Sequence, residues 1–351
     1  MAIPARPVEW RSYPSAHSQP RIRARRWRRR LTILALLQFL FPALATLLQL
    51  YGPERTTFGI VVLYLPSWIW GLPALILLLP MLRYAPRKLG LPIISLLWVA
   101  GPLMGFCWHT SISPSHSIPT LRIMTYNVKW GRRNPQAIAE TIRRFHPDVL
   151  VMQDSANILN SPVQGALHGY YTKTLYQCSV ASRYPILNAR SLSLSPGDPN
   201  YHAMQFQIRF DKHLVTIFSV HLLSPRWALL DLIKGHTDVL QEDARHRLAQ
   251  ATGLLKLLPS QEPTIVAGDF NSPPASLVCR ILEREGRLQD AFSKAGRGYG
   301  YTYGQYLLPP FPFLRIDHIF TSPQWQIYNC QTGDGVGSDH CPVVADLALV
   351  S

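Results

Sequence analysis

The sequence TIVAGDFNSP occupies residues 264–273, and this stretch decides the fold. A short β-branched run, Thr264–Ala267, leads through Gly268 directly to Asp269, and Asn271 follows two residues later. A buried strand has no use for a carboxylate at its end, because burying an unpaired charge costs free energy. The stretch therefore predicts a strand that carries a chemically active polar group to the edge of a sheet.

Three other predicted strands end in the same way. Each is a short apolar run followed by Asn, Asp or His: Leu121–Tyr126 by Asn127, Val149–Gln153 by Asp154, and Val215–Val220 by His221. Rigid scaffolds commonly present catalytic groups from the loops at strand ends. We therefore expect the polar residues at these strand ends to converge on one site at a common sheet edge.

The rest of the pattern mixes strands and helices without strict alternation. Further short runs rich in β-branched residues predict strands over Ser179–Ser182, Arg315–Phe320, Trp325–Cys330 and Val343–Val350. Apolar residues at helical spacing predict helices over Pro135–Phe145 and Asp243–Leu258. This mixed order favours an α/β sandwich of mixed sheets over a doubly wound parallel sheet.

The polar residues of these motifs suit the hydrolysis of a phosphate ester. A hard divalent ion such as Mg²⁺ takes oxygen ligands, usually carboxylates together with water and substrate phosphate. The candidates are the carboxylates Asp154, Asp269 and Asp339, the amides Asn127 and Asn271, and the imidazoles His221 and His340. Metal, carboxylate and imidazole together make water a usable nucleophile for in-line attack on phosphorus. The absence of clustered Cys and His in the sequence argues against a structural zinc site.

Seven short motifs, in order along the chain, resemble the endonuclease/exonuclease/phosphatase superfamily. That group includes deoxyribonucleases, apurinic endonucleases, sphingomyelinases and inositol-polyphosphate phosphatases. The motifs are Thr125–Asn127, Pro147–Asp154, Ser182–Ile186, Ser219–Leu222, Gly268–Pro273, Arg315–Phe320 and Ser338–Val343. The resemblance covers roughly Leu121 to Leu349, and it implies a four-layer α/β sandwich that uses Mg²⁺ or Mn²⁺.

The resemblance also implies a role for each motif residue. Asn127, Asp154 and Asp339 lie at the metal end of the site. Asp269 positions or deprotonates the attacking water, and Asn271 contacts the phosphate. His221 stabilises the transition state, and His340 is oriented by Asp317. Arg183 and Arg226 are candidates for contact with the substrate; the alternative for Arg183 is a structural ion pair, and for Arg226 a solvated surface. Structural alternatives also exist for the motif residues: Asn127, Asp269, Asn271 and Asp317 could form turns, since Asp and Asn favour turns, and His221 and His340 could be structural histidines.

Position 154 departs from the family pattern. The family usually has Gln-Glu where this chain has Gln153 and Asp154. Aspartate is one methylene shorter, so it either reaches the metal after a small shift or through water, or it is not a ligand. A catalytically weakened membrane scaffold is the non-enzymatic alternative that this change supports.

The first 110 residues have a different character. Residues 1–30 hold nine arginines and a single acid, and they account for most of the net charge of +15. Three long apolar runs follow, over Leu31–Leu50, Thr56–Leu82 and Leu89–Trp108. Twenty residues of helix match a hydrocarbon core of about 30 Å. We expect three transmembrane helices within residues 31–110. A cleaved signal peptide is the rival interpretation, but its apolar core would be shorter and stand alone.

Basic residues predict the orientation of these helices. The arginine-rich arm precedes the first run, and Arg83, Arg87 and Lys88 separate the second from the third. Because basic loops stay in the cytoplasm, an odd number of spans places the later residues outside it. Residues 111–120 are rich in Ser and Pro and predict a linker to a catalytic domain over 121–351. The expected protein is an integral protein of a plasma or inner membrane.

The substrate class stays open at this point. A nuclease would present a basic groove, yet the basic charge is concentrated in the arm rather than in the catalytic domain. A lipid phosphoesterase would act naturally beside a bilayer. The expected partners are a phosphate-ester substrate (nucleic acid or lipid headgroup) and the bilayer, with no obligate protein partner evident. Of the five cysteines, Cys178, Cys279, Cys330 and Cys341 either pair in an oxidising compartment or remain buried thiols.

Overall fold

The computed structural model describes residues 18–110, 118–195, 202–307 and 310–350. The chain forms two compact units. The helical unit runs up to Leu44 and resumes over Trp68–Ala100, and the catalytic unit comprises Ala45–Ser67 and the chain from Gly101 onward. The first residues of the predicted arm and most of the predicted linker lie outside the described residues.

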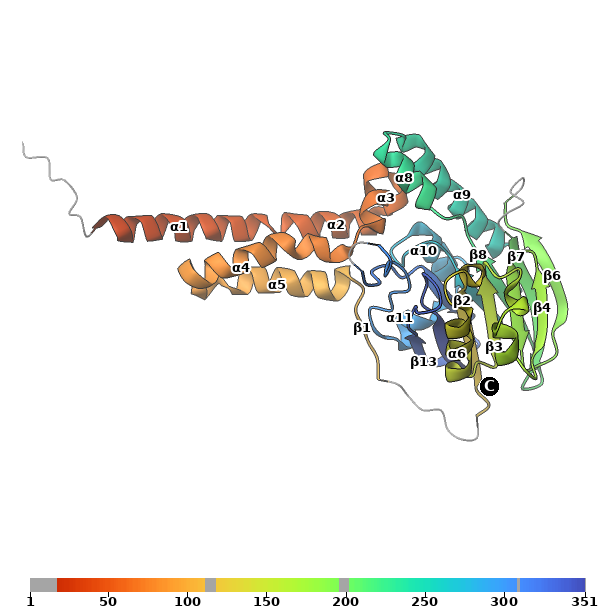
Figure 1. Ribbon diagram of the computed structural model, residues 1–351. Coiled ribbons are helices and arrows are strands. Elements are labelled where there is room, and N and C mark those ends of the chain that lie inside the picture. Colours follow the sequence, from red (N-terminus) through yellow and green to blue (C-terminus); the bar gives the residue numbers. More distant parts are fainter. Residues whose placement is uncertain (1–17, 111–117, 196–201, 308–309, 351) are drawn as a thin grey trace, which may run out of the picture. The chain divides into compact units, whose positions relative to one another are not determined.

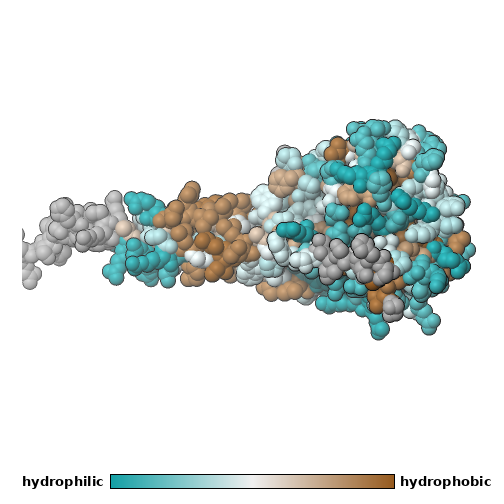
Figure 2. All heavy atoms as spheres, turned by 90° about the horizontal axis from the view of Figure 1, so that it is seen from below, coloured by the Kyte–Doolittle hydropathy of each residue, from teal (hydrophilic) through white to brown (hydrophobic). Residues whose placement is uncertain are grey.

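The helical unit is built from helices whose apolar side chains face outward. These are α1 (Ser18–Leu37), the first turn of α2 (Leu40–Tyr51), α4 (Leu72–Tyr84) and α5 (Gly90–Trp98). Leu79 is 77% exposed and Ile76 is 70% exposed. Figure 2 shows the apolar surface as a brown band next to a hydrophilic end. Large apolar side chains on the outside of a helix bundle are typical of contact with lipid.

Two helical stretches are long and apolar enough to cross a membrane, Ala24–Tyr51 and Ser67–Tyr84. The expected count of three spans is not supported. The run Leu89–Trp108 forms only the short helix α5, followed by a π-helical turn over Val99–Leu103 that contains Pro102. Proline removes a backbone donor, which explains why a regular helix ends here. The run Thr56–Leu82 is also not one span, because α3 (Thr57–Tyr64) ends before the second stretch begins.

The catalytic unit contains two six-stranded sheets (Figure 1). One has the order β13 (Trp325–Thr332), β14 (Val343–Leu349), β2 (Leu121–Asn127), β3 (Val149–Gln153), β5 (Cys178–Ser182) and β4 (Tyr171–Leu175). The other has the order β10 (Gln289–Asp290), β12 (Asp317–Thr321), β9 (Thr264–Asp269), β8 (His213–His221), β7 (His202–Phe210) and β6 (Leu187–Ser193). Among the described strands of these two sheets, β2–β3 and β8–β9 pair in parallel and the other neighbours pair antiparallel. Both sheets are therefore mixed, as the sequence predicts.

The two sheets pack face to face, and helices cover their outer faces. Alternate residues of each strand point to opposite faces, so Ile123 enters the core between the sheets while Met124 faces outward. The helices on the outer faces are α6 (Pro135–Phe145) and α7 (Val163–Ala166) on the first sheet, and α9 (Thr237–Leu255) and α10 (Leu277–Arg284) on the second. The predicted four-layer sandwich is confirmed. The two-stranded ribbon β1 (Cys107–Trp108) and β11 (Arg297–Gly298), with α8 (Arg226–Ile233) and α11 (Ala291–Ala295), completes the unit.

Residues 45–67, which the sequence assigns to the transmembrane region, belong to the catalytic unit. In α3, Ile60 and Leu63 are buried in one cluster with Leu240 of α9. The Glu54 carboxylate accepts a hydrogen bond of 2.9 Å from the backbone N–H of Leu277, at the start of α10. Helix α3 is therefore packed into the core of the catalytic unit through Ile60 and Leu63.

A second buried cluster fixes β10 to β12. Arg315 donates two hydrogen bonds to Asp290, of 2.7 and 2.9 Å, and both side chains are buried. His318 lies 3.1 Å from the same carboxylate. Burial alone would lower the pKa of His318, but Cys279 and Asp290 raise it to about 10.

All five cysteines are free thiols, so the alternative of disulfide bonds is not realised.

Candidate active site

Strand register aligns the polar residues at one end of the sheets. His221 lies opposite Asp269 in the parallel pair β8–β9, and Asp317 lies opposite Asp269 in the antiparallel pair β9–β12. In the other sheet, Asn127 ends β2 beside Gln153 of β3. The predicted convergence of the strand ends is therefore present, because Asn127 reaches across to Asp269 from the facing sheet.

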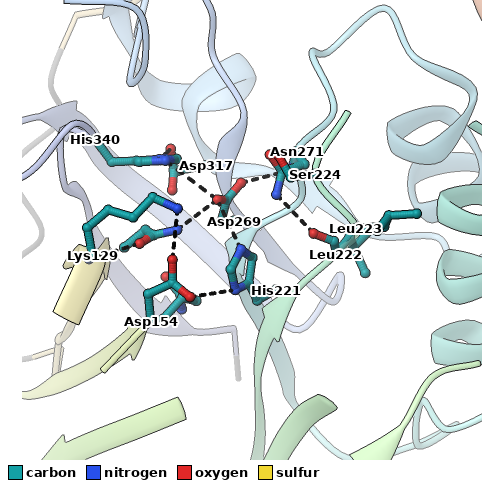
Figure 3. A network of polar contacts seen from close by, with 12 residues as sticks. Lys129, Asp154, His221, Leu222, Leu223, Ser224, Asp269, Asn271, Asp317 and His340 are labelled. Atoms are coloured by element: carbon teal, nitrogen blue, oxygen red, sulfur yellow. Dashed lines mark hydrogen bonds and ion pairs between the residues drawn. The ribbon is translucent and has the colours of Figure 1, made fainter. Parts of the chain in front are cut away.

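Asp269 lies at the centre of a polar network (Figure 3). Its Oδ2 atom accepts a hydrogen bond of 2.9 Å from the Asn127 amide, and its Oδ1 atom accepts one of 2.8 Å from the Asn271 backbone N–H. The Nε2 atoms of His221 and His340 lie 3.6 and 3.7 Å from Oδ2. The carboxylate is thus fixed by two donors and flanked by two imidazoles.

Electrostatics favours an ionised Asp269. Burial would raise the pKa of Asp269, but the nearby imidazoles of His340 and His221 lower it overall. Burial would lower the pKa of His340, but the carboxylates of Asp317 and Asp269 raise it to about 9. At neutral pH, His340 is therefore an imidazolium. It lies 2.9 Å from Asp317 Oδ2 through Nδ1, which orients the ring and leaves Nε2 facing Asp269.

The backbone of the Gly268–Asn271 motif explains its composition. A side chain at Gly268 would collide with the carbonyl oxygen of Val220 on the neighbouring strand. Asn271 has a φ of 48°, in the left-handed region that Asn tolerates better than most residues. Its side-chain amide donates to the carbonyl of Leu222, and its own carbonyl accepts a bond of 2.7 Å from the Tyr64 hydroxyl. The loop is therefore held from β8 and from α3.

The predicted metal end (Asn127, Asp154 and Asp339) contains a cation from the chain itself. The ammonium of Lys129 lies 2.8 Å from Asp154 Oδ2. Its backbone N–H donates to Asn127 Oδ1 at 3.2 Å. Burial would lower the pKa of Lys129, but Asp154, and then Asp269 and Asp339, raise it. Asp154 and Lys129 both have positive φ values, of 48° and 45°, a strain that is common at functional sites.

The donor set in this region fits a hard divalent cation. Carboxylate and amide oxygens are the ligands that Mg²⁺ and Mn²⁺ prefer. A second group, Asp269, Asp317 and His340, brings ligand atoms within 4.8 Å of one another. Within the described residues, the Oδ1 atom of Asp317 is buried without a hydrogen-bond partner. Burial raises the pKa of Asp317, with His340 opposing this shift. An acidic cluster is thus present in the site.

Two cavities open onto this network. The larger one has a volume of about 920 Å³ and contacts Asp154, Asp339 and His221. Its other walls are basic and aromatic: Lys129, Arg132, Arg133, Arg226, Trp130, Tyr176 and Trp227. The smaller cavity has a volume of about 280 Å³ and contacts Asp269, Asn271 and His340. The positive walls of the larger cavity suit an anionic group such as a phosphate.

Of the two predicted substrate-contact arginines, only Arg226 lines these cavities. Arg183 instead lies 3.8 Å from Asp148 and donates a hydrogen bond to the Tyr170 hydroxyl. It therefore makes the structural ion pair that was the alternative to substrate contact. Sequence analysis missed Lys129 and Tyr64. The position of Lys129, two residues after the strand-end residue Asn127, was the available sequence signal for a site residue. Tyr64 lies inside an apolar run, and nothing in that run indicates a role in the site.

Comparison with known families now decides the assignment. Residues 124–340 match the Endonuclease/Exonuclease/phosphatase family. The chain belongs to this family. Its members are hydrolases that act on phosphoester bonds and generally use divalent metal ions. The endonuclease/exonuclease/phosphatase domain of this chain is therefore a hydrolase of phosphoester bonds. No curated protein matches the sequence.

Solved structures share the fold at low sequence identity. A family protein from Bacteroides thetaiotaomicron is 18% identical, with a TM-score of 0.53, over 67% of this chain and 100% of its own. A mannosyl-6-phosphatase from the same species is also 18% identical, with a TM-score of 0.51, over 65% and 100%. A humanised TDP2 from D. rerio is 17% identical, with a TM-score of 0.52, over 65% and 98%. At these identities the likeness shows the fold alone.

Proposed function

We propose that this protein is a membrane-anchored, divalent-metal-dependent phosphoesterase in which water attacks the phosphorus atom in line. The observation that carries the proposal is the network around Asp269, a buried carboxylate fixed by Asn127 and the Asn271 N–H between two imidazoles. Phosphoryl transfer depends mainly on positioning and on stabilising charge. This network supplies fixed groups for both.

Asp269 acts as the general base. Its lowered pKa keeps it ionised, and its two hydrogen bonds fix the direction of its remaining lone pairs. A carboxylate held in this way orients a water molecule and accepts its proton as the bond to phosphorus forms. Asn271 is held by Tyr64 and Leu222, so the backbone N–H that positions Asp269 is itself fixed.

His340 stabilises the charge that develops on the phosphoryl oxygens. It is an imidazolium at neutral pH, and Asp317 orients it from behind. His221 faces the same carboxylate from β8, and its Nδ1 atom lies 3.6 Å from Asp154. Fixed positive groups in a buried site act more strongly on such charge than they would in water.

The metal end would hold Mg²⁺ or Mn²⁺ through Asn127, Asp154 and Asp339. When bound, the ion supplies Lewis-acid activation of the phosphate and lowers the pKa of its bound water. A cation held by Asp154 would compete with the ammonium of Lys129, which lies 2.8 Å from Oδ2 of that carboxylate.

The composition of the catalytic unit supports a location outside the cytoplasm. This unit includes residues on both sides of Trp68–Ala100. If α4 enters the membrane, the chain must return to the same face before Gly101, and the segment Trp68–Ala100 then adds no net crossing. A crossing by Ala24–Tyr51 then separates the basic arm from the catalytic unit. The arm stays in the cytoplasm by the rule for basic segments.

Hydrolysis is tested with the full chain in a phosphate-free amphipathic polymer. The substrates are 4-nitrophenyl phosphate and bis(4-nitrophenyl) phosphate, which separate monoesterase from diesterase action, with Mg²⁺ or Mn²⁺. We expect Asp269→Ala and His340→Ala each to lower kcat by roughly 10²–10⁴-fold. The matched controls are Asp334→Ala and His213→Ala, at exposed positions outside the site. Activity that survives a chelator, or survives both site variants, would refute the mechanism. A well-folded chain with no activity on either ester would favour the scaffold alternative.

A further inference from the structure

The smaller cavity has one polar wall and one apolar wall. The polar wall contains Asp269, His340 and Asn271 of the proposed active site. The apolar wall is formed by leucine, isoleucine and phenylalanine side chains: Leu229, Leu230, Leu307, Phe313, Leu314 and Ile316. A molecule whose phosphate lies against Asp269 therefore has its next atoms beside hydrocarbon.

The apolar side chains that line this cavity are partly buried in the protein and partly exposed to water. Phe313, Leu314 and Ile316 are buried, each less than a tenth exposed. Leu230 of α8 is 43% exposed and Leu307 is 46% exposed. Large aliphatic side chains left partly in water beside an active site indicate that an apolar group covers them when the site is filled.

Such walls discriminate between classes of phosphate ester. A nucleobase carries donors and acceptors around its edge, and burying these against hydrocarbon without partners costs free energy. An alkyl chain has no such groups, and each methylene removed from water contributes favourably. Lys129 and Arg226 line both cavities, so positive charge lies where the two cavities share residues, and Trp227 lines only the larger one. A charged headgroup beside these two cations and a hydrocarbon tail against the apolar side chains of the smaller cavity match this lining.

The chain itself connects this cavity to the membrane anchor. Tyr64 lines the cavity, and its hydroxyl donates to the carbonyl of Asn271. Ser67, only three residues later, is the first residue of a stretch able to cross a membrane. Three extended residues reach at most about 11 Å. The covalent chain thus keeps one wall of the cavity close to the first residue of a candidate span.

We propose that the smaller cavity binds the hydrocarbon part of an amphiphilic phosphate ester, so that the substrate is a lipid-like molecule drawn from a bilayer. The inference rests on the proposed function and names its substrate class. The apolar walls bind the tail, and the basic cavity binds the headgroup. Asp269 and His340 then face the phosphorus atom between them.

The test measures inhibition by monoalkyl phosphates, from ethyl to octyl phosphate, on the full chain in the phosphate-free polymer. The reporter reaction is hydrolysis of whichever 4-nitrophenyl ester the enzyme accepts. We expect the inhibition constant to fall by roughly fourfold per methylene until the cavity is filled, the equivalent of about 0.8 kcal/mol. Leu230→Gln and Leu307→Gln should flatten this dependence. Val350→Gln, at an exposed aliphatic position outside both cavities, should leave it unchanged.

The outcomes separate the two levels of the proposal. Absence of reporter hydrolysis refutes the proposed function. Normal reporter hydrolysis with no dependence on chain length refutes only the lipid-like substrate, and so does an unchanged slope in both leucine variants. A nucleoside monophosphate that inhibits more strongly than octyl phosphate would overturn the inference in favour of a nucleic-acid substrate.

Discussion

Replacing Lys129 by methionine is expected to strengthen the binding of Mn²⁺ at the metal end of the site. In the wild-type chain an ion held by Asp154 would compete with the ammonium of Lys129, which lies 2.8 Å from Oδ2 of that carboxylate. Methionine has a similar length but carries no charge. The carboxylate of the variant is therefore left without its cation, and the ion binds without that competition.

The burial of the pair sets the size of the effect. The Lys129 side chain is 28% exposed and the Asp154 side chain only 2%. Exposed ion pairs contribute roughly 0.2–1 kcal/mol, whereas breaking a fully buried pair costs roughly 3–5 kcal/mol. A partly buried pair lies between these limits, at about 1–2 kcal/mol. The dissociation constant for Mn²⁺ should then fall by roughly 5–30-fold in Lys129→Met.

The assay is a titration of the substrate-free full chain with Mn²⁺, followed by the paramagnetic resonance of the free ion. Arg144→Met is the matched control, because Arg144 forms an ion pair of the same length, 2.8 Å, with exposed Asp334. Equal or weaker Mn²⁺ binding by Lys129→Met would refute the reasoning. Such a result would mean that Lys129 helps to hold the site in shape, or that Asp154 is not a ligand.

Three further predictions concern the parts that support the site. Tyr64→Phe removes the hydroxyl that donates to the Asn271 carbonyl. It should lower the free energy of unfolding in urea by about 0.5–1.5 kcal/mol and should change kcat more than KM. An unchanged unfolding free energy together with an unchanged kcat would contradict a positioning role. Arg315→Met leaves the Asp290 carboxylate buried without its main partner and should cost roughly 3–5 kcal/mol in the same unfolding assay; a loss below 1 kcal/mol, roughly the limit for an exposed pair, would show that the pair is solvated. His318 has a raised pKa, so its stabilising contribution is complete below its ordinary value of 6.5 and is lost as the pH rises through about 10. Urea midpoints of His318→Asn should therefore lose this alkaline dependence, and a wild-type slope in the variant would exclude His318 as its origin.

The strand ends that carry the site residues could be predicted from the sequence, because each is marked by residues next to one another in the chain. Strand ends marked by Asn127, His221 and Asp269 are visible in a single sequence, and sheet register then aligns them without further information. The pairing of His340 with Asp317 came from the family resemblance, and the structure places these two side chains 2.9 Å apart. The roles of these residues stay predictions until the variants are measured.

The misplaced boundary has a physical cause. Ile60 and Leu63 have the hydropathy of a membrane span, yet both are buried against α9. Leu79 has the same character and is 77% exposed. Hydropathy measures the preference to leave water, and it does not distinguish lipid from a protein core. Lys129 was missed for another reason: its position two residues after Asn127 was a signal, but the left-handed backbone at Lys129 and its ion pair with Asp154 cannot be predicted from residue type.

The bond between Tyr64 and Asn271 has a consequence for biosynthesis. The two residues are 207 positions apart. At roughly 5–20 residues synthesised per second, helix α3 emerges about 10–40 s before its partner loop exists. During that interval Ile60 and Leu63 lack the α9 side chains that bury them in the folded chain. Helix α3 therefore reaches its place only after α9 and the loop around Asn271 have been made, and a chain that stops before them leaves the apolar side chains of α3 unpaired.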